Sequence, residues 1–127
     1  MRLLLDSHVV LWWLADDQRL GPQARDLIAS EDVTMLSVVT PWELGIKRAR
    51  GELTLPDGFD DALRDEAFEM LPITGSHVRT TIRLPLHHRD PFDRMLIAQA
   101  IEEQLTLVTA DRAFDVYDGV AVLSASV

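Results

Sequence analysis

The feature that most constrains the fold is an apolar run near the start of the chain, Leu3 to Leu5, which ends directly on a carboxylate, Asp6. Successive apolar residues face both sides of a strand, a pattern typical of parallel sheets that helices cover on both faces. An unpaired carboxylate is costly to bury. We therefore expect Asp6 at the carboxyl end of a buried strand, the edge at which open α/β sheets bind their ligands.

A second run of the same design lies near the other end of the sequence. Residues 105–109 are apolar and β-branched, and Asp111 follows closely. Between these two segments, strand-like and helical patterns alternate along the chain. This alternation predicts the α/β class, as a three-layer α/β/α fold with a central, mostly parallel sheet of four to five strands.

Helix start signals divide the rest of the chain. Ser7, Thr40 and Asp90 are expected to cap the longer helices, and the latter two precede a proline at the first helical position. In the middle helix, Trp42 and Ile46 are expected to face inward. The expected helices are 9–14, 24–30, 41–51, 59–67, 77–84 and 91–101, and the expected strands are 3–5, 33–36, 69–73, 105–109 and 120–123.

Length, charge and cysteine content limit the number of domains and the classes of protein that the chain can belong to. A chain of 127 residues is long enough for one core, so a single domain over residues 1–127 is expected. The net charge of −9 argues against a passive electrostatic nucleic-acid binder but not against an enzyme that uses bound cations. The absence of cysteine excludes disulfides and thiolate metal sites and favours a cytoplasmic protein. The apolar run at 9–15 is far shorter than the roughly 20 residues that span a bilayer, so no membrane association is expected.

Four acids fall where strands end or helices begin: Asp6, Glu43, Asp93 and Asp111. In a parallel sheet these positions share one edge, so the four carboxylates can converge there. Glu43 and Asp93 also have a purely structural interpretation, because the helix dipole favours an acid in the first turn. If the carboxylates do converge, their mutual repulsion requires a cation, and an all-oxygen set of ligands suits Mg²⁺ or Mn²⁺.

A family resemblance rests on four segments in order: L-L-L-D-S-H at 3–8, P-W-E-L at 41–44, H-R-D-P-F-D-R-M-L-I-A-Q-A at 88–100 and L-V-T-A-D at 107–111. Together they resemble the motifs of PIN-domain ribonucleases, in particular the VapC-type toxins of bacterial toxin–antitoxin pairs. The resemblance extends over nearly the whole chain. It implies a metal-dependent endoribonuclease that hydrolyses RNA phosphodiesters and is inhibited by a cognate antitoxin protein. A second copy of the chain is the other partner that it implies.

The resemblance also assigns residues. It places the acidic quartet on Asp6, Glu43, Asp93 and Asp111, as metal ligands and catalytic groups. The expected supporting residues are Ser7 and Thr109, which would hold the carboxylates or their waters, and Asp90, which is expected to cap a helix. Arg94 would contact substrate phosphate or form a surface ion pair with a nearby acid. The chain departs from the family at Gln104, where glycine is common between helix and strand.

One further interpretation remains open at this stage, namely a non-catalytic or signalling α/β domain that binds Mg²⁺ through the same acidic edge. A receiver-like domain is disfavoured because the only lysine, Lys47, lies within an expected helix. The four histidines have no spacing that gathers them on one helix or strand face. His8, His77, His87 and His88 are therefore expected on the surface or in loops rather than at a metal.

Overall fold

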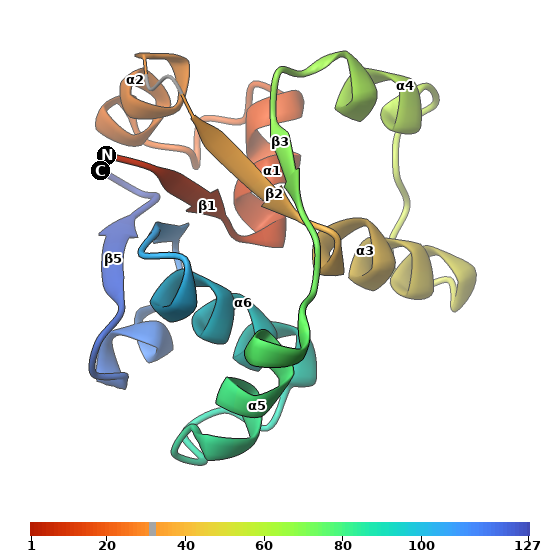
Figure 1. The fold of residues 1–127 in the computed structure, drawn as a ribbon. Helices are drawn as coiled ribbons and strands as arrows, with labels where there is room; N and C mark the ends of the chain where they lie inside the picture. The colour runs from red at the N-terminus through yellow and green to blue at the C-terminus, as the bar shows by residue number, and fades with distance from the viewer. Residues whose placement is uncertain (31–32) are drawn as a thin grey trace.

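A parallel sheet forms the centre of the protein. The computed structural model describes residues 1–30 and 33–127, and within these ranges the sheet has five strands in the order β3-β2-β1-β4-β5 (Figure 1). All four strand pairs are parallel. The strands are β1 (Leu3–Leu5), β2 (Thr34–Ser37), β3 (Glu69–Leu71), β4 (Thr106–Thr109) and β5 (Ala121–Ser124).

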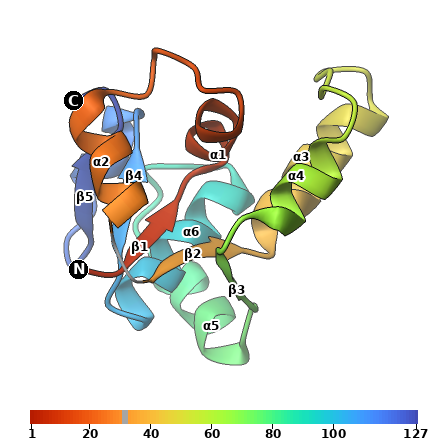
Figure 2. The same ribbon diagram turned by 90° about the horizontal axis from the view of Figure 1, so that it is seen from above.

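Helices cover both faces of this sheet, and the side chains of β1 alternate between them. Leu4 packs on the side of α6 (Pro91–Glu102). Leu5 packs on the opposite side, with residues of α1 (Ser7–Leu14) and α2 (Pro22–Ser30). Figure 2 shows α1 and α2 together on that side of the sheet. The predicted three-layer arrangement is therefore confirmed. The other helices are α3 (Val39–Ala49), α4 (Phe59–Asp65), α5 (Gly75–Arg83) and the 3-10 helix η1 (Arg112–Val116).

The strand order creates a crevice at one point of the sheet edge. From β1 the chain proceeds outward to β2 and β3, and it then returns to add β4 and β5 on the other side of β1. Helices that leave neighbouring strands in opposite directions open a gap between the carboxyl ends of those strands, which here are β1 and β4. Asp6 follows β1 and Asp111 lies just beyond β4. The fold thus brings residues from the two ends of the sequence to one crevice.

Two of the predicted helix caps are wrong. Asp6, not Ser7, caps α1: its Oδ1 accepts a hydrogen bond from the Ser7 N–H at 2.7 Å, and Ser7 is the first helical residue. Helix α3 begins at Val39, before the proline, with Val38 at the N-cap position; the Ser37 hydroxyl accepts from the Val39 N–H at 3.1 Å. Thr40 consequently lies inside the helix. The third cap is correct, since Asp90 accepts from the backbone N–H groups of α6.

The inward face of α3 also differs from the prediction. Trp42 is 57% exposed, whereas Val39, Glu43 and Leu44 are buried. Starting the helix two residues earlier does not change its periodicity; the difference arises because α3 lies beside the crevice and turns Glu43 toward it. Gln104 adopts the left-handed conformation, with φ of 56°, so the turn from α6 to β4 forms without glycine. Among the described helices, none is long and apolar enough to cross a membrane.

The two hydroxyls at the start of α3 should respond oppositely to removal. Ser37→Ala removes the hydrogen bond to the Val39 N–H and is expected to lower the free energy of unfolding by about 1 kcal/mol. Thr40 Oγ1 is buried and has no hydrogen-bond partner among the described residues, so Thr40→Val should raise the free energy of unfolding by up to about 1 kcal/mol. Urea denaturation measures both values. Equal destabilisation by the two substitutions would contradict these different roles of the two hydroxyls.

Candidate metal centre

All four acids of the expected quartet line one pocket of about 540 Å³. Each comes from a different element: Asp6 from the β1–α1 junction, Glu43 from α3, Asp93 from the first turn of α6, and Asp111 from the β4–η1 junction. The capping acid Asp90 lies at the same pocket. Local folding explains three of these positions, because Asp6, Asp93 and Asp111 lie where a strand ends or a helix begins. Glu43 was expected in the first turn of its helix, but α3 starts at Val39 and Glu43 lies one turn further on.

Two of the acids are buried and held by hydroxyl groups. Asp6 is 7% exposed and Glu43 is 5% exposed. The Thr109 hydroxyl donates to Asp6 Oδ2 at 2.8 Å, and the Ser7 hydroxyl donates to Glu43 Oε1 at 2.7 Å. Each carboxylate therefore has a fixed orientation. Ser7 and Thr109, the expected supporting residues, lie in contact with the acids in the manner of groups that orient metal ligands.

A lysine side chain balances part of the negative charge. Lys47 Nζ donates to Glu43 Oε2 at 3.0 Å, one turn further along α3. This hydrogen bond raises the pKa of Lys47, so the ammonium stays charged. Lys47, Arg19 and His8 all line the acidic pocket.

Burial and the crowding of the acids raise the pKa values of two of them, Asp93 and Asp6. Burial, followed by the neighbouring Asp90, Asp6, Glu43 and Asp111 carboxylates, raises the pKa of Asp93 to about 7. Burial also raises the pKa of Asp6, against the lowering effect of its hydrogen bonds from Thr109 and Ser7. Crowded carboxylates of this kind are stabilised by a divalent cation, and their all-oxygen chemistry fits one.

Asp111 occupies a more open position than the other members. Its carboxylate is 51% exposed and accepts from the Ala113 N–H at 2.9 Å, which starts η1. Its own backbone N–H donates to the Thr109 hydroxyl at 3.1 Å. The same hydroxyl donates to Asp6, so Thr109 links the two acids that follow β1 and β4.

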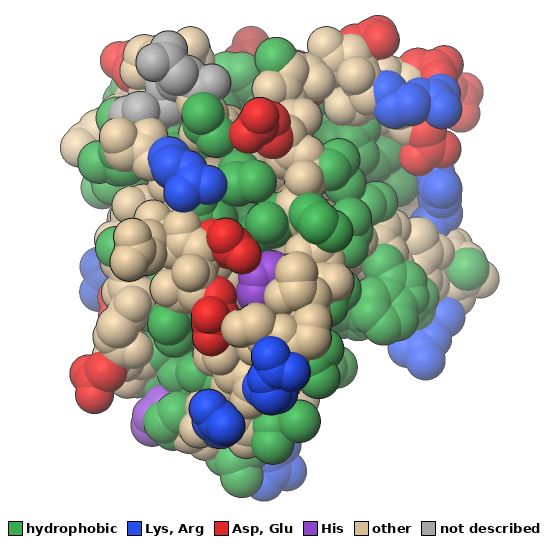
Figure 3. All heavy atoms as spheres, in the orientation of Figure 1, with side chains coloured by type: hydrophobic (Ala, Val, Ile, Leu, Met, Phe, Trp, Pro, Cys, Tyr) green, Lys and Arg blue, Asp and Glu red, His purple; other side chains and the backbone are tan. Residues whose placement is uncertain are grey.

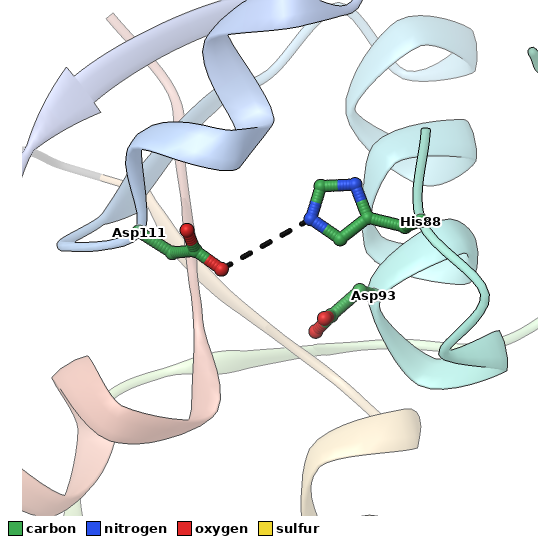
Figure 4. A group of neighbouring side chains, drawn as sticks. All are labelled: His88, Asp93 and Asp111. Carbon is green, nitrogen blue, oxygen red and sulfur yellow. Dashed lines mark ion pairs between the residues drawn. The ribbon is translucent and has the colours of Figure 1, made fainter. Parts of the chain in front are cut away.

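His88 was expected away from any metal site, but its ring lies beside the acids. The imidazole of His88 is only 9% exposed, and Nε2 lies 4.0 Å from Asp111 Oδ2. Ligand atoms of His88, Asp93 and Asp111 all lie within 4.8 Å of one another (Figure 4). His88 is in a loop, as expected, but its ring points toward the acids. The sequence offered one indication that His88 lies near the acids, which is its position two residues before Asp90. Helix or strand periodicity gives no information about a loop residue.

Arg94 was expected near substrate phosphate, but its side chain is bound elsewhere. Its guanidinium donates to the backbone carbonyls of Thr81, Leu84, Pro85 and His88. These contacts occupy the side chain and hold the segment that precedes α6. Arg94 therefore positions a loop, and its geometry does not support the expected contact with substrate phosphate.

Comparisons with known proteins agree with this geometry. The family model for the PIN domain matches residues 3–120. Ribonuclease VapC22 of Mycobacterium tuberculosis is 35% identical over 113 residues, which is 87% of each chain. The fold resembles VapBC2 from Rickettsia felis, solved bound to a DNA fragment from its promoter, with a TM-score of 0.76 at 14% identity over 98% of both chains.

A second solved structure shows the same likeness. The DNA-bound VapBC of Salmonella typhimurium matches with a TM-score of 0.74 at 15% identity, again over 98% of both chains. At such low identity these two structures bear on the fold alone. The family model spans nearly the whole chain and the curated relative exceeds a third identity, so the chain belongs to the PIN-domain family.

Proposed function

We propose that this protein is a divalent-metal-dependent endoribonuclease that acts in the cytoplasm as the toxin of a toxin–antitoxin pair. The observation that carries the proposal is the convergence of Asp6, Glu43, Asp93 and Asp111 in one pocket, with the pKa of Asp93 raised to about 7. The 35% identity to a protein named as a ribonuclease supports RNA as the substrate class. The sequence-based proposal of one domain over 1–127 is in keeping with the extent of the PIN match.

Asp6, Glu43 and Asp93 would hold the cation, with Asp111 completing the site directly or through water. Mg²⁺ or Mn²⁺ is the proposed ion, because the ligands are carboxylate oxygens. When bound, such an ion lowers the pKa of a coordinated water and stabilises negative charge on phosphate oxygens. The all-oxygen set and the crowding of charge are features of the chain itself, so metal affinity can be measured independently of catalysis.

The residues around the acids have defined parts in this proposal. Ser7 and Thr109 fix the carboxylates through hydrogen bonds of 2.7 and 2.8 Å. Arg19 and Lys47 line the pocket, where they pair with Asp17 and Glu43, and they place positive charge beside an approaching phosphodiester that the protein's net charge of −9 would otherwise repel. RNA would therefore be bound through local cations rather than through the overall field of the protein.

The antitoxin and the homodimer remain proposals. Two apolar surfaces are open to partners. One is a groove of about 540 Å³ between α1 and residues 53–62, which shares His8, Trp12 and Arg19 with the acidic pocket. The other is a recess of about 610 Å³ between α3, α5 and the start of α6, and Figure 3 shows hydrophobic side chains along this side of the molecule. Sedimentation with and without the antitoxin tests both partners.

Removing a ligand charge should abolish cleavage. Asp6→Asn and Asp93→Asn are each expected to reduce Mn²⁺-dependent cleavage of RNA by at least about 100-fold, because metal stabilisation of transition-state charge contributes several kcal/mol. Ser7→Ala and Thr109→Val, which leave the acids in place, should cost about 10- to 100-fold. Cleavage of total RNA with and without Mn²⁺ measures these effects.

The matched control for these variants is Asp26→Asn, an exposed acid on α2. It should cleave RNA as the parent does. Metal-dependent cleavage that persists in Asp6→Asn or Asp93→Asn, at the rate of this control, would refute the proposed site. Metal binding without any cleavage by the parent would instead favour a non-catalytic domain.

Asp93 should also determine how the stability of the metal-free protein depends on pH. Its pKa is raised from 3.8 to about 7 in the folded state, so the folded protein holds this proton more tightly than the unfolded chain. Ionisation of Asp93 therefore lowers the free energy of unfolding as pH rises from about 4 to about 7, with no further change above that range. Asp93→Asn escapes this loss.

The stability of Asp93→Asn relative to the parent should thus increase between about pH 4 and pH 7, on the order of 1 kcal/mol once solvent screening of this partly exposed group is included. Urea denaturation in the presence of a chelator measures the difference. Asp26→Asn should show no such trend. A parent that gains stability relative to Asp93→Asn over this range would contradict the raised pKa.

A further inference from the structure

The imidazole of His88 is a buried polar group, and one of its two nitrogens lacks a hydrogen-bond partner among the described residues. Its side chain is 9% exposed, and Nε2 makes no hydrogen bond to any of the described residues. Leaving a buried nitrogen without a partner costs free energy, so such a group in a folded protein calls for an explanation. The nearest acid oxygen to Nε2 is that of Asp111 at 4.0 Å, which is too long for a hydrogen bond.

The surroundings of His88 hold the ring in place. It lies against Phe114, with centroids 4.8 Å apart, and stacks on Tyr117 at 5.4 Å. The His88 backbone N–H donates to Tyr117 Oη at 2.8 Å, and Nδ1 lies 3.2 Å from the same oxygen. Tyr117 Oη can accept the Nδ1 proton, which leaves the Nε2 lone pair free; metal-binding histidines use this arrangement.

The loop that carries His88 is fixed from its other side. Arg94 donates to the His88 carbonyl at 3.2 Å and to the carbonyls of Leu84 and Pro85 at 3.0 and 2.9 Å. The backbone and the ring of His88 are therefore both anchored, although the residue belongs to no helix or strand. A ring oriented this firmly, with its free nitrogen turned toward two carboxylates, is typical of a ligand held ready for an ion.

We propose that His88, Asp93 and Asp111 form a second cation position, adjacent to the one at Asp6, Glu43 and Asp93 and sharing Asp93 with it. The inference rests on the proposed function only through that shared acid. The three ligand atoms lie within 4.8 Å of one another, whereas a metal about 2.1 Å from each ligand needs separations of no more than about 4.2 Å. Rotation of the half-exposed Asp111 side chain can close this difference.

The two positions differ in chemistry and so in the ions they select. Asp6, Glu43 and Asp93 offer oxygen alone, which suits Mg²⁺ and Mn²⁺ equally. The position at His88 adds an imidazole nitrogen, which favours transition-metal ions such as Mn²⁺ and Zn²⁺ over Mg²⁺. The chain is thus expected to bind two Mn²⁺ ions, with only the first position filled readily by Mg²⁺.

The first test is the number of Mn²⁺ ions bound by the purified full-length chain, from electron paramagnetic resonance titration at about pH 8. The parent should bind two ions. His88→Phe keeps an aromatic ring between Phe114 and Tyr117 but removes Nε2, and it should bind one ion with at least about a tenfold loss of affinity at the other position. His87→Phe, the same substitution at the exposed neighbouring histidine, should bind two.

Asp6→Asn separates this inference from the proposed function. It should weaken the first position and retain an ion that depends on His88. A parent that binds a single Mn²⁺, with the same affinity in His88→Phe, would overturn the second position while leaving the first intact. Loss of all binding in Asp6→Asn would likewise overturn it.

The second test needs no substitution and so does not depend on the folding of a variant. In the ¹⁵N spectrum of the parent imidazoles, addition of Zn²⁺ should shift the His88 Nε2 resonance, whereas Mg²⁺ at a concentration that fills the first position should leave it in place. An Nε2 resonance that fails to respond to Zn²⁺ would show that His88 is only a charge neighbour of Asp111.

Discussion

A strand that is covered on both faces and paired along both edges leaves only its end for a polar group, and β1 is such a strand. Leu4 pairs with Met35 on one side and Leu107 on the other, and all three leucines of β1 are fully buried. The first carboxylate after β1, that of Asp6, has three roles. It caps α1, accepts from Thr109, and faces the pocket. The other three acids of the quartet line the same pocket as Asp6.

Much of this arrangement could be predicted because it depends on patterns repeated along the chain. Apolar runs that end in Asp identify β1 and β4, and parallel pairing of those strands then requires Asp6 and Asp111 to be close. The start of α3 could not be predicted in the same way. The sequence favours Thr40 as the cap because a proline follows it, but the path of the chain after β2 starts the helix at Val39 and leaves Thr40 inside it.

The loop residues lay beyond sequence reasoning for a related reason. Nothing in the sequence pattern around His88 indicates where its side chain points, because a loop has no period. Arg94 lies in the first turn of α6, but its backbone partners belong mainly to the irregular segment before that helix. Arg94 was expected to contact phosphate since it follows an acid of the quartet, yet four backbone carbonyls bind its guanidinium. Charge near a site is thus weak grounds for assigning a substrate contact. The carbonyl groups of a neighbouring loop, which no sequence pattern displays, compete for the same side chain.

The ion pair between Lys47 and Glu43 has a consequence for the order in which the protein is assembled. Four carboxylates gathered without any cation would oppose the closure of the fold, and such a chain would have to acquire its metal while folding, as small zinc-dependent domains do. Here a covalently attached ammonium, 3.0 Å from Glu43, relieves part of that repulsion from the start. If the pocket binds the proposed divalent ion, the chain would be able to fold before that ion binds, and the supply of free metal in its surroundings would govern when the folded protein becomes active.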